Sequence, residues 1–113
     1  MDREKAAYIR HYFSHLMTDD EQSALRYHMY TYKTSHNPEM RKLLIEKGWI
    51  STDPKIAAFL KHGYGEFELN VATRIMAETP EKVFFNNCPA CGKLPRTPYA
   101  KQCRYCGHSW REI

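Results

Sequence analysis

The four cysteines of this chain all lie near its C-terminus. They form two Cys-x-x-Cys pairs, Cys88 with Cys91 and Cys103 with Cys106, separated by 11 residues. Two residues between paired cysteines let one tight turn point both sulfurs at a common place, and the glycine after each pair can adopt the positive φ that ends such a turn. Zn²⁺ takes four thiolates as a tetrahedron with bonds of about 2.3 Å. The spacing therefore predicts one closed four-cysteine metal site.

Other chemistry for the same cysteines is less favoured. Structural disulfides need an oxidising compartment, and the charged N-terminal residues 1–5 precede no apolar signal core. A reactive dithiol is disfavoured because all four cysteines fit one metal site. Iron remains an alternative, since four thiolates also hold iron and selection between metals depends on geometry and availability. We expect one structural Zn²⁺, with iron as the second choice.

The residues around each pair resemble the knuckles of zinc-ribbon and rubredoxin-like domains. The matching motifs are Cys88-Pro-x-Cys91-Gly-Lys and Cys103-x-x-Cys106-Gly-His-x-Trp110, so the resemblance covers about the last quarter of the chain. It implies a four-cysteine zinc site on a β-hairpin, usually structural and often found in proteins that bind nucleic acid or other proteins. The whole chain also resembles small bacterial or phage proteins with a helical front and a ribbon tail, which implies no activity.

Length and composition fit a small globular protein. The 113 residues leave room for one domain, or for a small helical domain with an attached ribbon. Hydrophobic residues make up 42% and charged residues 27%, and no apolar run approaches the roughly 18 residues of a membrane span. We therefore expect a cytoplasmic protein that does not enter the membrane.

Helical periodicity and capping signals predict five helices before the cysteines. They are expected over residues 2–17, about 19–33, 38–47, 54–62 and 65–78, and the last should be the most buried. In the third helix Met40, Leu43 and Leu44 are expected to face the core. Val83-Phe84-Phe85 predicts a short strand leading into the first cysteine pair.

These elements predict a mainly α fold of about five short helices followed by a C-terminal zinc-ribbon β-hairpin. The expected division is a helical domain over residues 1–79 and a four-cysteine zinc-ribbon domain over residues 80–113, docked on the helices. His11 and His15 share a helical face, but without a third ligand in a recognisable motif we expect them to be solvent-exposed. His108 is not expected to bind the metal, because four cysteines complete the tetrahedron.

No motif for catalysis is present, and a site closed by four thiolates leaves zinc no position for water. We therefore expect a non-enzymatic interaction or adaptor protein, with a protein partner. The alternative is nucleic-acid binding, because residues 82–113 hold six Lys or Arg against one Glu. Part of this basic charge is also suited to balancing the thiolates. The candidate contact residues are Lys93, Arg96, Tyr99, Lys101, Arg104 and Tyr105. An electron carrier with iron at the cysteines is the third hypothesis.

Overall fold

The computed structural model describes residues 1–110 of the chain. Its helices precede the cysteines, and the mainly helical prediction with five α-helices is confirmed for these residues. The elements are α1 (Arg3–Tyr12), the short 3-10 helix η1 (Ser14–Leu16), α2 (Asp19–Lys33), α3 (Pro38–Glu46), α4 (Pro54–Ala58), α5 (Tyr64–Glu78) and the 3-10 helix η2 (Pro80–Lys82). The last three residues of the predicted ribbon domain lie outside the described part.

Local capping determines where most helices begin. The Thr18 hydroxyl accepts a hydrogen bond from the Glu21 backbone N–H at 3.1 Å, and the Glu21 carboxylate accepts one from the Thr18 backbone N–H at 2.8 Å. This capping box satisfies two donors that a helix start leaves unpaired. Asp2 caps α1 and Asn37 caps α3 through their side-chain oxygens. Two helices are shorter than predicted, because Phe13 leaves helical geometry after α1 and α4 ends at Ala58.

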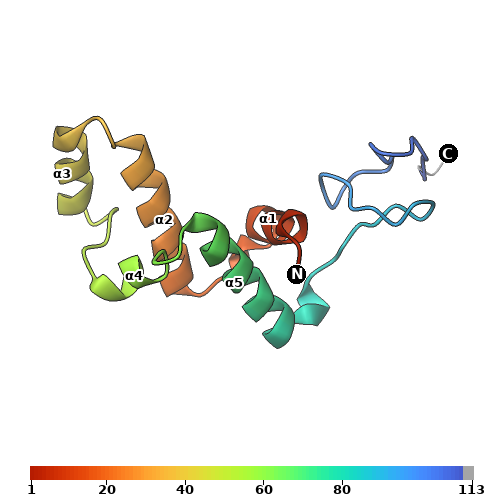
Figure 1. The fold of residues 1–113 in the computed structure, drawn as a ribbon, viewed down its shortest axis with the longest axis horizontal. Helices are drawn as coiled ribbons and strands as arrows, with labels where there is room; N and C mark the ends of the chain where they lie inside the picture. Colours follow the sequence, from red (N-terminus) through yellow and green to blue (C-terminus); the bar gives the residue numbers. More distant parts are fainter. Residues whose placement is uncertain (111–113) are drawn as a thin grey trace.

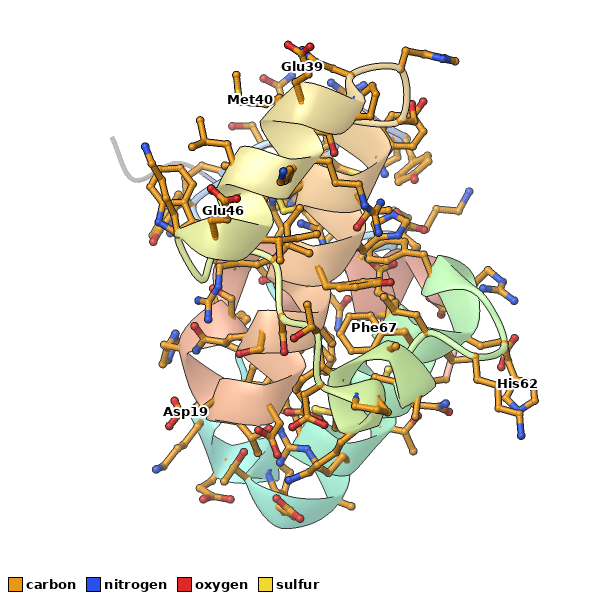
Figure 2. All side chains as sticks on the ribbon, turned by 90° about the vertical axis from the view of Figure 1, so that its left-hand side faces the viewer. Asp19, Glu39, Met40, Glu46, His62 and Phe67 are labelled. Atoms are coloured by element: carbon orange, nitrogen blue, oxygen red, sulfur yellow. The ribbon has the colours of Figure 1, made fainter. Side chains whose placement is uncertain are left out.

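The hydrophobic core lies where α1, α2, α4 and α5 meet. Phe67, Val71 and Ile75 of α5 are buried, which confirms that this helix contributes most to the core, and Ile9 of α1 packs with them. Figure 2 shows Phe67 in the interior beside α4. Leu94, which follows the first cysteine pair, belongs to the same cluster. The helices therefore share their core with the segment that carries the cysteines.

A buried ion pair between Glu21 and Arg74 connects α2 to α5. Glu21 is 4% exposed, and its carboxylate accepts two hydrogen bonds from Arg74, at 2.7 and 2.5 Å. The Arg74 guanidinium also donates to the Leu16 carbonyl at 3.2 Å. Glu21 is thus saturated by its own helix start and by α5, which satisfies the requirement that a buried charge be paired.

Residues 26–50 form a projecting helical hairpin, called here the α2–α3 arm, which contains the second half of α2, the helix α3 and the turn after it. The molecule measures 53 × 29 × 23 Å, with α3 at one end and the cysteine segment at the other (Figure 1). Its radius of gyration of 17.3 Å exceeds the roughly 13 Å of a compact chain of this length. The base of the arm packs on the rest of the molecule, where His28 stacks on Tyr64 with ring centroids 4.3 Å apart and Tyr27 packs against the core.

The expected inward face of α3 is partly wrong. Leu44 is buried, but Met40 and Leu43 are 44% and 41% exposed. Figure 2 shows Met40 projecting outward beside Glu39. The physical reason is that α3 packs mainly on one helix, α2, so only one row of its apolar residues is covered.

The expected β-hairpin at the cysteines is not formed by regular strands. Within residues 1–110 no β-strand is present, and the nearest feature is one antiparallel bridge between Gln102 and Ser109. Residues 83–85 are extended without a partner strand. Tight turns use the backbone groups near the cysteines, and Pro95 and Pro98 have no N–H to donate to a ladder. The cysteine segment is stabilised by tight turns and by side-chain hydrogen bonds instead.

Within the described residues, no helix has both the length and the apolar character that crossing a membrane requires.

Candidate metal centre

The two cysteine pairs form turns with the same hydrogen bonds. In the first turn, the Ala90 N–H donates to the Cys88 sulfur at 3.4 Å, and the Gly92 N–H donates to the Cys88 carbonyl at 2.8 Å. The Cys88 N–H donates in turn to the Lys93 carbonyl at 2.9 Å. Gly92 has φ of 74°, a left-handed conformation that a residue without Cβ adopts without strain.

The second turn repeats each of these bonds 15 residues later. The Tyr105 N–H donates to the Cys103 sulfur at 3.4 Å, and the Gly107 N–H donates to the Cys103 carbonyl at 3.0 Å. The Cys103 N–H donates to the His108 carbonyl at 2.8 Å. Gly107 has φ of 78°. Both turns therefore direct sulfur and backbone N–H groups toward one centre, which favours negative charge on the sulfurs.

The four sulfurs form one cluster, as the spacing predicted. They lie within 4.8 Å of one another, and all four cysteines are free. Across the two turns, the Cys88 and Cys106 sulfurs are 3.7 Å apart, and those of Cys91 and Cys103 are 3.5 Å apart. Four sulfurs at about 2.3 Å from one ion in a tetrahedron would be about 3.8 Å apart. The donor set is compatible with a four-cysteine metal site.

Backbone hydrogen bonds favour ionisation of two of the four thiols, Cys88 and Cys103. By contrast, against the opposing hydrogen bond from the His108 backbone, burial and the neighbouring cysteine thiols raise the pKa of Cys106 to about 11. The backbone N–H of Cys106, opposed by burial and assisted by the N–H of Tyr105, lowers the pKa of Cys103 to about 6. Burial raises the pKa of Cys88, but the N–H groups of Cys91 and Ala90 outweigh it and lower that pKa overall. Metal ligands must be thiolates. Hydrogen bonds from the backbone thus favour the ligand form of the two buried cysteines.

The segment before the first turn is held by a buried amide. Asn86 is 6% exposed, and its side-chain NH₂ donates to the Thr97 carbonyl at 3.2 Å and the Ala100 carbonyl at 2.8 Å. It thereby fixes the loop between the two turns, where only one backbone bridge exists. The sequence analysis missed Asn86, because a single asparagine carries no spacing signal.

The cysteine segment contacts α1 through a hydrogen bond and an aromatic pair. The Tyr8 hydroxyl donates to the Phe84 carbonyl at 2.6 Å, and the Tyr8 ring stacks near Phe85, with centroids 5.8 Å apart. Burial raises the pKa of Tyr8, so its hydroxyl stays a donor. Phe85 packs on the helices, whereas Phe84 is 59% exposed.

Three of the six candidate contact residues lie together beside α1, two of them on the Glu4 carboxylate and the third, Lys93, on the Tyr105 ring. Arg104 and Tyr105 both donate to Glu4, at 2.7 and 3.0 Å. The Tyr105 ring lies 4.7 Å from the Lys93 ammonium and 4.7 Å from the Arg104 guanidinium. Cations on this ring occupy the surface that a base would need for stacking. The contact of Arg104 and Tyr105 with Glu4 could not be recognised from the sequence, because about 100 residues separate them from Glu4.

The other three candidates remain exposed on the loop between the turns. Arg96 and Lys101 are exposed, and Tyr99 is 80% exposed. His108 is absent from the metal-competent groups found in the described residues. It lies beside Trp110, with ring centroids 6.1 Å apart.

No family model, curated protein or solved structure matches this chain.

Proposed function

We propose that the four cysteines hold one Zn²⁺ and that the ion serves as the structural centre of a zinc ribbon. The cluster of four sulfurs within 4.8 Å supports this most directly. Zinc imposes no preferred geometry of its own and suits a closed tetrahedron of four thiolates, which is the donor set that the two turns present. Residues 88–106 contain little regular structure, so a bound ion would supply folding free energy, about 10–16 kcal/mol in finger peptides.

Metal analysis of the purified protein tests this proposal. The expected result is one zinc per chain, a colourless solution and cobalt substitution that gives the absorption of tetrahedral thiolate ligation. A red protein with thiolate-to-iron charge-transfer absorption would instead identify iron and favour the electron-carrier hypothesis. Absence of stoichiometric metal, with all four thiols freely alkylated and the fold unchanged, would refute the metal site.

We further propose that the protein is a non-enzymatic, cytoplasmic adaptor, and that the α2–α3 arm is its protein-binding surface. Support comes from five large apolar side chains that are exposed on this arm: Met29, Tyr32, Met40, Leu43 and Trp49. Exposed apolar side chains in such number on two neighbouring helices and the turn after them are candidates for an interaction site. The arm is also basic, with Lys and Arg outnumbering Glu over residues 26–50. An apolar partner surface bordered by carboxylates would complement both properties.

An arm variant tests the adaptor proposal. Leu43→Glu places a charge on the exposed apolar surface, and Lys61→Glu, an exposed site outside the arm, is its matched control. Cross-linking in the native host followed by mass spectrometry should identify a partner contacted through residues 26–50. Loss of this partner with Leu43→Glu and its retention with Lys61→Glu are expected. Equal capture by both variants would contradict the assigned surface.

Nucleic-acid binding is the second candidate. It is supported by Tyr99, whose exposed ring lies in the loop between the two exposed cations Arg96 and Lys101. Titration with labelled single strands at about 50 mM salt, where phosphate contacts are weakly screened, tests it. Binding that weakens steeply with added salt is expected if this candidate is right, and no binding at this salt would leave the adaptor proposal alone.

A further inference from the structure

A pocket of about 320 Å³ lies between α1 and the loop that follows the first cysteine turn. On the loop side it is lined by Leu94, Pro95 and Arg96, of which the first two are buried. On the helix side, its walls include Tyr8 and Tyr12. Sites for small ligands occupy about 300–1,000 Å³, so this pocket is of a size for one small unit.

The pocket is rich in guanidinium groups. Arg10, Arg96 and Arg104 line it, against a single carboxylate, Glu4. Arg104 is bound to Glu4 at 2.7 Å, and Arg10 is bound through its Nε to Glu68 at 3.0 Å. Among the described residues, the ion pairs do not include Arg96. Arg96 is therefore the cation available to an incoming anion, and its planar fork suits phosphate.

The same pocket has an aromatic wall. His11 is exposed, and its ring meets the half-buried Tyr12 edge-on, with centroids 4.6 Å apart. Tyr12 packs in turn on the buried Tyr8, with centroids 5.6 Å apart. A flat heterocycle can stack on such rings, because every base has a π-face. Aromatic rings and an arginine that forms no ion pair within residues 1–110 together match a ligand that is aromatic at one end and anionic at the other.

We propose that this pocket binds one nucleotide unit, with its phosphate on Arg96 and its base against His11 and Tyr12. The unit is either a free nucleotide or one residue of a single-stranded nucleic acid, because both present this chemistry. The inference deepens the nucleic-acid candidate and rests on the metal site, since one wall of the pocket belongs to the loop between the cysteine turns. It adds α1 to the recognition surface, whereas Tyr105 takes no part in stacking.

The test uses the zinc-loaded full chain and two matched pairs of variants. Arg96→Ala removes the proposed phosphate ligand, and Lys61→Ala removes an equal charge from an exposed site outside the pocket. His11→Ala removes the proposed stacking ring, and His15→Ala is its exposed counterpart outside the pocket. Fluorescence anisotropy would follow binding of a labelled oligothymidylate of about eight residues at about 50 mM salt. AMP and inorganic phosphate serve as competitors.

The unsubstituted protein should bind the strand, and Arg96→Ala should weaken binding about tenfold or more. Arg96→Ala should also reduce the slope of log affinity against log salt by about 0.7, the value for one phosphate contact in a single strand. His11→Ala should weaken binding about fivefold or more. Lys61→Ala and His15→Ala should change affinity by less than about twofold. Metal content is measured for every variant, so that loss of the ion is not mistaken for loss of the pocket.

The competitors distinguish the two sources of the ligand. Competition by AMP identifies a free nucleotide as sufficient, whereas displacement only by an unlabelled strand identifies a residue within a chain. Either result supports the pocket. Competition by inorganic phosphate as strong as by AMP would overturn the role of the aromatic wall. Absence of binding by fully metallated protein, or equal weakening by Arg96→Ala and Lys61→Ala, would overturn the proposal while leaving the zinc site standing.

Discussion

Asn86 holds the loop between the two cysteine turns through hydrogen bonds, not through a covalent or metal bond. Its amide satisfies two carbonyls of the loop between the cysteine turns from a buried position. Removing a buried donor leaves its partners unsatisfied, at a cost of about 1–3 kcal/mol for each group. The loop that carries Arg96 and Tyr99 is therefore shaped by one side chain as well as by the cysteines.

Substitution of Asn86 by Ala should lower the free energy of unfolding by about 2 kcal/mol or more. Its exposed neighbour provides the control, because Asn87→Ala removes an amide with no such burial. Chemical denaturation of the metal-loaded proteins measures both. Equal stability of the two variants would show that the amide does not hold the loop.

Substitution of the single residue Cys91 tests the assignment of the four metal ligands. Cys91→Ser should abolish stoichiometric metal binding, because a hydroxyl replaces one of four thiolates, and should unfold residues beyond about 85 more than the helices. His108→Ala should keep the metal, because its side chain lies outside the cluster. Metal analysis and hydrogen exchange measure these effects. A Cys91→Ser protein that retained tightly bound stoichiometric zinc would contradict the ligand assignment.

At the scale of elements, α1 and α5 are connected by a polar chain as well as by apolar packing. Glu68 of α5 accepts hydrogen bonds from Arg10 and from the Tyr64 hydroxyl, both at 3.0 Å. Burial, with Glu68 adding to it and Arg10 opposing it, raises the pKa of Tyr64 to about 12 from the ordinary 10. The folded protein therefore holds this proton more tightly than the unfolded chain does.

The consequence is a pH dependence of stability between about pH 10 and 12. Below pH 10 both states keep the proton and the contribution of Tyr64 is constant. Above pH 10 the unfolded chain loses the proton first, so the contribution falls as the pH approaches 12. Tyr64→Phe should be less stable than the unsubstituted protein at neutral pH, and the difference should shrink across this window.

Urea unfolding at several pH values measures this difference. Tyr32→Phe is the control, because Tyr32 is 78% exposed, and its difference from the unsubstituted protein should stay near zero throughout. A Tyr64→Phe difference that remained constant from pH 9 to 12 would contradict the raised pKa.

The sequence predicted those features of the elements that depend on interactions between residues close together in the chain. Helix starts at Thr18 and Asn37 were predictable, because capping uses atoms three residues apart. The cysteine cluster was predictable for the same reason, since each pair is a local turn. The exposure of Met40 was not predictable, because it depends on which neighbour α3 lacks. The contact of Arg104 with Glu4 joins residues 100 positions apart, beyond any periodicity or motif.

At the scale of the whole molecule, Leu94 connects the cysteine segment to the helices. It is 6% exposed and packs in the same cluster as the buried residues of α1 and α5. The separation into domains 1–79 and 80–113 stays a prediction, and Leu94 offers its direct test. If the two parts depend on each other, truncating this side chain will weaken both.

Leu94→Ala should lower the free energy of unfolding of the helical part by about 2–4 kcal/mol, the usual cost of removing a buried Leu side chain. Leu43→Ala, at an exposed site, should cost less than about 1 kcal/mol. Far-UV circular dichroism in urea follows the helices in both variants. An unchanged helical midpoint with Leu94→Ala would show that the cysteine segment folds without supporting the helices.

The two similar cysteine turns also determine how a bound metal ion would be released. Each turn keeps one cysteine buried, Cys88 or Cys103, and the other exposed, Cys91 or Cys106. A chelator in solution would first contact the exposed sulfur of each turn, while the two buried sulfurs remain bound to the ion. Metal exchange would thus begin at the exposed side of the site. It would pass through an intermediate in which the ion is still bound by one buried sulfur from each turn. The rate of metal release would therefore depend on the chelator concentration.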